Sequence, residues 1–127
     1  MKTFFFFIFI LVSSVFWLRN WVSTGNMDRA IKENPNAKVT PMVVRTIGDV
    51  YYHIFRQTDS AIHYYQWFIQ DFPGDNRAPE VHWDLGRAYE ELNRRDLALE
   101  QYTILRSSFS TTQQGRMALE RYNRIRY

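Results

Sequence analysis

The sequence predicts an all-α protein of packed helical hairpins, and three observations lead to this prediction. After about residue 40, apolar side chains recur at the three- and four-residue spacing of amphipathic helices. No stretch alternates apolar and polar residues with a period of two, and no hairpin-turn dipeptide separates two β-rich runs. The connections between the expected helices are short, which favours antiparallel helices packed side by side.

An apolar segment comes first in the chain and is expected to form a hydrophobic helix over residues 1–22. Residues 3–18 carry no charge and are rich in phenylalanine, with Lys2 before them and Arg19 after them. A basic start followed by a hydrophobic run is the layout of a signal segment. The same layout fits a transmembrane anchor, although 16 uncharged residues are fewer than the roughly 20 that a spanning helix uses.

Two fates of this segment stay open. A signal peptidase could cut near Val12-Ser13-Ser14 or near Val22-Ser23-Thr24, although neither site has the Ala-x-Ala pattern. An uncleaved anchor would place Trp17 and Trp21 at the membrane–water interface, where amphipathic rings are favoured. We favour the single-pass anchor with the rest of the chain in the periplasm or another extracytoplasmic space. Cleavage would instead give a secreted or periplasmic protein.

Residues 23–40 are expected to form a linker that contains a short helix at 28–33. Gly25-Asn26 marks the break before it, and Asn34-Pro35-Asn36 ends it because the residue before a proline disfavours helical geometry. Thr40-Pro41 then supplies an N-cap followed by a proline at the first helical position. From there we expect one domain, residues 41–127, with helices at about 41–56, 59–71, 78–93, 96–108 and 111–126.

Composition narrows the classes of function. The chain has no cysteine, which removes disulfides, thiolate metal sites, cysteine nucleophiles and a lipid-modified N-terminal cysteine. Its three histidines form no His-x-x-x-His or Glu-x-x-His ligand pattern. Neither a glycine-rich phosphate loop nor a Gly-x-Ser-x-Gly turn is present. We therefore predict that the protein is not an enzyme and needs no metal and no cofactor.

Charge is placed unevenly along the chain. Residues 71–100 carry eight acids and four bases, whereas residues 101–127 carry five arginines and one acid. An acidic centre next to a basic end favours electrostatic docking, with solvated helix faces as the plain alternative. The basic end suits an acidic partner or an anionic lipid surface. Nucleic acid is not expected, because an anchor or export segment argues against that compartment.

The domain repeats itself at an offset of 37 residues. Small residues face large ones in each unit, as two closely crossing antiparallel helices require: Gly86 and Ala98 are small, and Tyr89 is large. The matched pairs are Tyr52 and Tyr89, Asp59 and Asp96, Ala61 and Ala98, Tyr65 and Tyr102, and Phe72 and Phe109.

At these residues the sequence resembles the tetratricopeptide-repeat (TPR) family. Leu85-Gly86-Arg87-Ala88-Tyr89 matches the family's Leu-Gly-x-x-Tyr, and Ala98 and Tyr102 follow at the family's spacing. Pro73 falls where the family has its turn proline. The period of 37 is longer than the usual 34 and is similar to that of bacterial cell-envelope members, of the Tol–Pal coordinator and BamD-like type. The resemblance implies a short solenoid with repeats at about 42–78 and 79–112 and a capping helix at 111–126.

The resemblance also implies a concave groove, lined by the first helix of each hairpin, in which a protein segment binds. In the first hairpin Gly48 and Tyr52 indicate alignments that differ by one residue, and we prefer the alignment through Tyr52. Trp83 fits the core as well as it fits the groove. The groove positions implied in this way are Thr46, Val50, His53, Glu80, Trp83, Arg87, Glu90, Glu91, Glu120 and Arg124.

We therefore expect a membrane-anchored or exported interaction module, which acts as a subunit or assembly factor of a membrane or envelope complex. Its partners are proteins, and residues 3–22 contact the membrane. The alternatives are a permanent structural subunit without a free groove and a cleaved periplasmic adaptor. Aromatic side chains crowd the first hairpin, which favours an interface with a neighbour. The sequence leaves the oligomeric state open.

Overall fold

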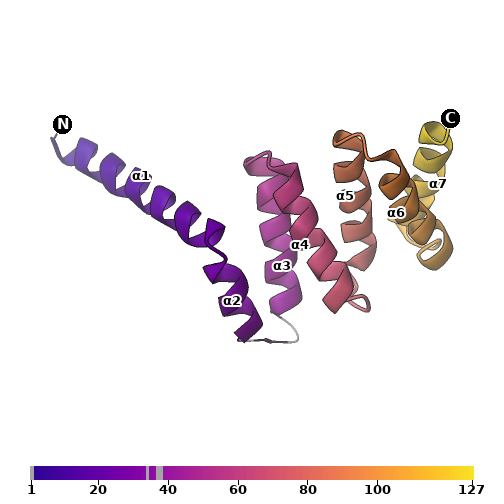
Figure 1. Ribbon diagram of the computed structural model, residues 1–127, viewed down its shortest axis with the longest axis horizontal. Coiled ribbons are helices and arrows are strands. Elements are labelled where there is room, and N and C mark those ends of the chain that lie inside the picture. The colour runs from indigo at the N-terminus through magenta and orange to yellow at the C-terminus, as the bar shows by residue number, and fades with distance from the viewer. Residues whose placement is uncertain (1, 34, 37–38) are drawn as a thin grey trace. The chain divides into compact units, whose positions relative to one another are not determined.

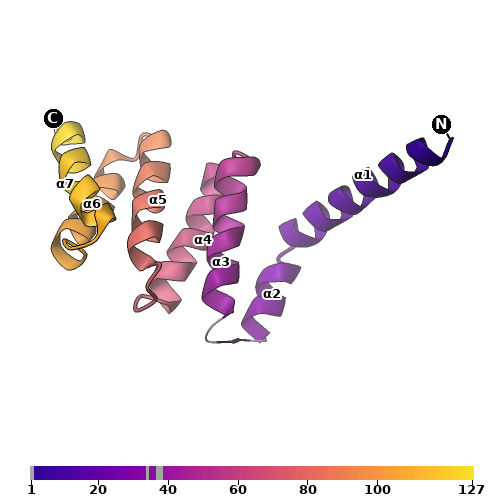
Figure 2. The ribbon, with the colours of Figure 1, turned by 180° about the vertical axis from the view of Figure 1, so that it is seen from behind.

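The regular secondary structure of the described residues is entirely helical, and short turns and loops connect the helices. The computed structural model describes residues 2–33, 35–36 and 39–127, and their side chains apart from those of residues 2–4, 22 and 23. No strand occurs in this part of the chain, which confirms the predicted all-α class. The elements, shown in Figures 1 and 2, are α1 (Lys2–Ser23), α2 (Asn26–Glu33), α3 (Thr40–Asp49), the π-helix η1 (Val50–Ile54), α4 (Thr58–Asp71), α5 (Ala78–Glu91), α6 (Arg95–Ser108) and α7 (Gln113–Ile125).

The chain divides into two compact units, Met1–Ala37 and Lys38–Tyr127. In the first unit, Gly25 separates α1 from α2 at a φ of +74°, a conformation that glycine adopts without steric cost. The apolar side chains of residues 5–18 of α1 are exposed within this unit, and Trp21 is half-buried. None of the described helices is by itself both long and apolar enough for a membrane span. The pair Phe5–Trp21 and Asn26–Glu33, bent by 67°, meets that test only together.

Helix α2 begins two residues before the expected short helix and ends with it, at Glu33. The expected stop at residues 34–36 falls partly outside the described residues, because Asn34 is not among them. The same holds for Ala37 and Lys38 of the expected linker.

In the second unit each helix packs against the next one in chain order. Contacts join α3 to α4, α4 to α5, α5 to α6 and α6 to α7, and α7 also reaches α5. Both views show α3 to α7 following one another in this order (Figures 1 and 2). The helices begin and end within two residues of the expected bounds. The N-cap of α3 falls on Val39, one residue before the expected Thr40, and Pro41 lies in the first turn.

Two glycine–tyrosine crossings hold the hairpins together. A Cβ atom built on Gly48 would lie 2.7 Å from the ring of Tyr65, and one built on Gly86 would lie 2.7 Å from the ring of Tyr102. Both tyrosines have no exposed surface. Glycine is therefore needed at both crossings because a tyrosine ring occupies the space that any larger side chain would take.

The π-helix η1 explains why the first hairpin admits two alignments. Tyr52 lies four residues after Gly48, whereas Tyr89 lies three residues after Gly86. The extra residue is absorbed in η1, where the backbone N–H of Phe55 donates to the carbonyl of Val50 over 3.1 Å. The glycines therefore correspond at an offset of 38 and the tyrosines at 37. Upstream of the π turn, the alignment through Gly48 is the one that matches the structure.

Candidate functional site

A pocket of about 260 Å³ opens across α3, α5 and α7. These three helices alternate with α4 and α6 in the chain, so the pocket crosses the first helix of each hairpin and the last helix of the chain. Most of the side chains that line it are polar, and one is aromatic. They include Arg45 from α3, Glu80, Trp83 and Asp84 from α5, and Gln113 and Gln114 from α7.

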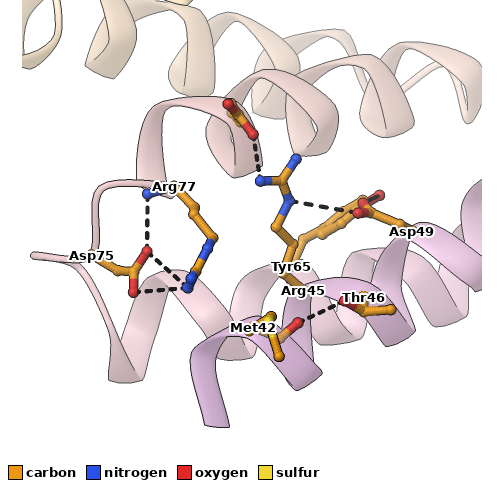
Figure 3. A network of polar contacts seen from close by, with 8 residues as sticks. Met42, Arg45, Thr46, Asp49, Tyr65, Asp75 and Arg77 are labelled. Carbon is orange, nitrogen blue, oxygen red and sulfur yellow. Dashed lines mark hydrogen bonds and ion pairs between the residues drawn. The ribbon is translucent and has the colours of Figure 1, made fainter. Parts of the chain in front are cut away.

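Arg45 is held between two carboxylates from different helices. Its Nη1 forms an ion pair with Glu80 of α5, and its Nε lies 3.5 Å from Oδ2 of Asp49, one turn further along α3. Asp49 in turn accepts a hydrogen bond of 2.8 Å from the hydroxyl of Tyr65 in α4. Figure 3 shows the guanidinium group of Arg45 beside Asp49, with dashed lines that mark its ion pairs. The network ties three helices together and neutralises the positive charge of Arg45.

Asp84 is the carboxylate of the pocket that this network leaves out. Among the described residues, none donates a hydrogen bond to it or forms an ion pair with it. Burial, together with the nearby charge of Asp49, raises the pKa of Asp84 to about 6. The charges of Arg45, His53 and Arg87 act in the opposite direction but do not offset the burial. Asp84 is thus a half-buried acid that has no hydrogen-bond or ion-pair partner among the described residues.

Trp83 forms the aromatic wall of the pocket. Its ring lies 5.4 Å from that of Tyr102, measured between centroids, and the residue is half-buried. One part of the indole therefore belongs to the packing between α5 and α6, while another part faces the pocket. The two interpretations of Trp83 that the sequence left open are both compatible with this position.

Glu90 and Glu91 accept hydrogen bonds from residues of neighbouring helices. Glu90 accepts from Nη2 of Arg121 over 2.6 Å and from the hydroxyl of Tyr102 over 2.6 Å. Burial alone would raise the pKa of Glu90, but these hydrogen bonds outweigh it and lower the pKa. Glu91 accepts a 2.5 Å hydrogen bond from the hydroxyl of Tyr52. Both acids are therefore already engaged within the domain.

The other expected groove positions lie at different places. His53 is exposed in η1, and Arg87 is exposed on α5; their charges act on Asp84. Glu120 and Arg124 form an exposed ion pair of 3.1 Å on α7. Val50 is half-buried in η1, and the exposed Thr46 donates a hydrogen bond to the carbonyl of Met42 (Figure 3).

Sequence reasoning missed several residues of the pocket, notably Arg45, Asp84 and the two glutamines of α7. In the alignment through Gly48, Arg45 corresponds to Trp83, which is a groove position. The sequence therefore held a signal for Arg45, but we preferred the alignment through Tyr52, in which Thr46 corresponds to Trp83. The preferred alignment selected Thr46 instead, one residue away. For Asp84 no spacing gave a signal, because its role depends on burial beside Asp49.

The buried His82 pairs with another buried side chain, between α5 and α6. Its Nδ1 lies 2.8 Å from Oε1 of Gln101, and burial lowers the pKa of the imidazole despite this hydrogen bond. At the corresponding positions of the first hairpin lie Val44 and Tyr64, so the polar pair belongs to the second hairpin alone. Within the described part of the chain, no three His, Asp or Glu side chains are grouped so that they would hold a metal ion.

Comparison with known proteins adds no relative. No protein-family model matches the chain, and no curated protein matches it significantly. The described structure defines the protein at the level of an all-α chain whose helices pack in order, with a polar pocket across α3, α5 and α7.

Proposed function

We propose that residues 41–127 form a short TPR module that binds a segment of another protein along α3, α5 and α7. The observation that carries this proposal is the repeated crossing, Gly48 under Tyr65 and Gly86 under Tyr102. Stacked helical hairpins generate extended concave surfaces, which repeat proteins use for binding. The pocket at Trp83 lies on the helices that would line such a surface.

Helix α7 fits the role of a terminal cap. The side-chain oxygen of Thr112 accepts a 3.0 Å hydrogen bond from the backbone N–H of Gly115, which fixes the start of the helix. Ala118 is fully buried against the stack, while Leu119 and Glu120 are exposed. A solenoid needs such an element because its last apolar face would otherwise meet water.

We also propose that residues 1–22 anchor the protein in a membrane, with cleavage during export as the alternative. The support is the uncharged, phenylalanine-rich run of residues 3–18 within α1. The apolar side chains of residues 5–18 are also exposed, Phe9 at 70% and Trp17 at 67% among them. A helix of 22 residues is about 33 Å long, close to the roughly 30 Å of a bilayer core. The repeat domain would then act beside the membrane, as a subunit or assembly factor of a membrane complex.

Site-specific photo-crosslinking in living cells tests the groove. A photoreactive amino acid replaces Arg87, which is exposed on α5, or Glu100, which is exposed on α6 as a matched control. We expect a defined crosslinked protein from position 87 and none from position 100. Identical products from both positions, or none from position 87, would reject the groove as a binding surface.

One observation favours the alternative of a permanent structural subunit. Large apolar side chains are exposed just before, on and after the first helix of the stack: Val39 at 48%, Met42 at 48%, Ile54 at 69% and Phe55 at 50%. A separately expressed chain of residues 38–127 distinguishes the two functions. A folded, monomeric domain supports the transient module, whereas aggregation that only a co-expressed partner prevents supports the permanent subunit.

The anchor has its own test. Alkaline carbonate extraction of membranes, followed by mass spectrometry of the N-terminal peptide, separates the two fates of residues 1–22. Retention in the membrane pellet with the peptide present supports the anchor. A shortened protein in the soluble fraction supports cleavage and rejects the anchor.

A further inference from the structure

The pocket beside Trp83 has a definite charge preference. Its one lining arginine, Arg45, is shared by Glu80 and Asp49, so its positive charge is already neutralised. Asp84 is the lining carboxylate that none of the described residues pairs. A half-buried charge that has no hydrogen-bond partner within the protein is less well stabilised than one in open water. A cation that enters the pocket would pair with the Asp84 carboxylate and remove this unfavourable free energy.

The elements around Asp84 do not supply that cation. Helix α3 contributes Arg45 and Asp49, and the hydroxyl of Tyr65 in α4 donates to Asp49. The charges of His53 and Arg87 are felt at Asp84, but both side chains are exposed and neither forms an ion pair with it. Helix α7 contributes the neutral side chains Gln113 and Gln114.

Trp83 adds a second feature that selects the same kind of ligand. A tryptophan face attracts ammonium and guanidinium groups and also covers the aliphatic stem of a long side chain. The pocket volume of about 260 Å³ is below the roughly 300–1,000 Å³ of sites that hold drug-sized molecules. One long side chain is therefore the expected occupant rather than a small-molecule ligand.

We propose that this pocket takes a lysine or arginine side chain from the bound protein segment, with Asp84 accepting hydrogen bonds from its charged head and Trp83 covering its stem. This inference rests on the proposed function and deepens it, because it states the chemistry of the partner: a basic segment rather than an acidic or purely apolar one.

The test selects short random peptides on the full-length protein held in detergent micelles. Lysine and arginine are expected to be enriched on the wild-type protein and on the control variant Glu100→Gln. The enrichment is expected to be lost on Asp84→Asn and on Trp83→Leu. In a selected peptide, replacing the critical arginine by its neutral isostere citrulline should weaken binding about tenfold or more, because a charge-assisted hydrogen bond is lost.

Asp84→Asn is a sharp test because its effects on folding and binding have opposite signs. The change removes an unpaired, partly buried charge and is expected to stabilise the fold, so weaker binding cannot come from unfolding. Raised salt should also weaken binding of the wild type, and so should a fall from about pH 7 to about pH 5, since Asp84 becomes protonated.

The outcomes separate this inference from the proposed function. Acidic or apolar peptides that bind the Trp83 face would overturn the proposal of a cation-binding pocket but leave the proposal of a binding groove standing. Basic peptides that bind Asp84→Asn as well as the wild type would also overturn it, because Asp84 would then have no part. Failure to select any peptide, together with no crosslinking at position 87, would overturn both.

Discussion

At the scale of single residues, the crossing of Gly86 and Tyr102 sets a strict size limit. A methyl group at Gly86 would lie 2.7 Å from a ring carbon of Tyr102, and the ring is fully buried and cannot move aside freely. Alanine would gain about 1 kcal/mol of helix propensity over glycine. Overpacking costs about 1–3 kcal/mol, and a 2.7 Å contact with a buried ring lies towards the upper end of that range. The packing effect is therefore expected to dominate.

We predict that Gly86→Ala lowers the free energy of unfolding by about 1–2 kcal/mol. Gly48→Ala should act in the same way, because Tyr65 occupies the corresponding space. Gly74→Ala is the control: no atom lies within 4 Å of its added Cβ, so it should be neutral or slightly stabilising. Urea denaturation followed by circular dichroism measures all three. Equal stability of Gly86→Ala and wild type would contradict the crossing.

Asp84 gives a prediction with a definite pH dependence. Its pKa is raised to about 6 in the fold from an ordinary value of 3.8, chiefly by burial. The fold thus favours the protonated acid. The stability that Asp84 contributes is fully present below about pH 3.8 and is lost as the pH rises through about 6.

Asp84→Asn is therefore expected to be more stable than the wild type near pH 7 by roughly 1–2 kcal/mol, and the difference should shrink towards pH 4. Comparing the two proteins isolates this carboxylate from His82, whose lowered pKa makes the fold less stable in acid. Glu100→Gln, an exposed change on α6, should leave the stability unchanged at both pH values. A constant difference across this range would show that Asp84 keeps its ordinary titration.

At the scale of elements, η1 behaves as one inserted residue. Deleting Val50 would place Tyr52 three residues after Gly48, as Tyr89 follows Gly86. The π turn should then become an α-helix while the helix on both sides keeps its orientation. We predict that this deletion changes the unfolding free energy by less than about 1 kcal/mol.

The matched control deletes Ile47, which lies before Gly48 and outside the π-helix. That deletion rotates the start of α3 by one residue and moves Val44, which is fully buried, off the core. A loss of more than about 2 kcal/mol is expected, as for other disruptions of a core. Thermal unfolding of both deletion variants decides the matter: if the Val50 deletion is as damaging as the Ile47 deletion, η1 is not an insertion.

The elements also show which features the sequence could predict and which it could not. Helical periodicity and the proline Pro41 located the helices closely, because these signals are local. The groove residues depended on register, and a single extra residue near Val50 shifted the helix before it. No pattern in one sequence shows whether such a residue is absorbed in a π turn or changes the whole alignment. Arg45 was missed for this reason.

Burial was the second property that the sequence could not give. Glu90 and Glu91 look like free surface acids, yet they accept hydrogen bonds from Arg121 and Tyr52 on neighbouring elements. Asp84 looks like any other helix acid, and its raised pKa comes from burial first and from the nearby charge of Asp49 second. Such pairings join residues far apart in the chain, so they emerge only when the helices are packed.

At the scale of the whole domain, α7 is expected to decide whether the stack is stable. It packs against both α5 and α6, buries Ala118 completely, and supplies Arg121, whose guanidinium neutralises Glu90. Repeat proteins are stabilised mainly by interfaces between neighbouring units, and a terminal element keeps the last interface from water. Because the stack has few helices, each interface contributes a large share of the total stability of the domain.

We predict that ending the chain after Ser110 abolishes cooperative unfolding of the domain. The change exposes the α6 face that α7 covers and leaves Glu90 without Arg121, and an unpaired, partly buried charge is strongly unfavourable. Removing only Arg126 and Tyr127, which are both exposed, is the control and should leave the melting curve unchanged. Calorimetry of the full chain and of the two shortened chains measures the effect. If the chain that ends at Ser110 keeps a sharp transition at the original midpoint, the hairpins α3–α4 and α5–α6 are stable without a cap, and the stability of the domain lies within them.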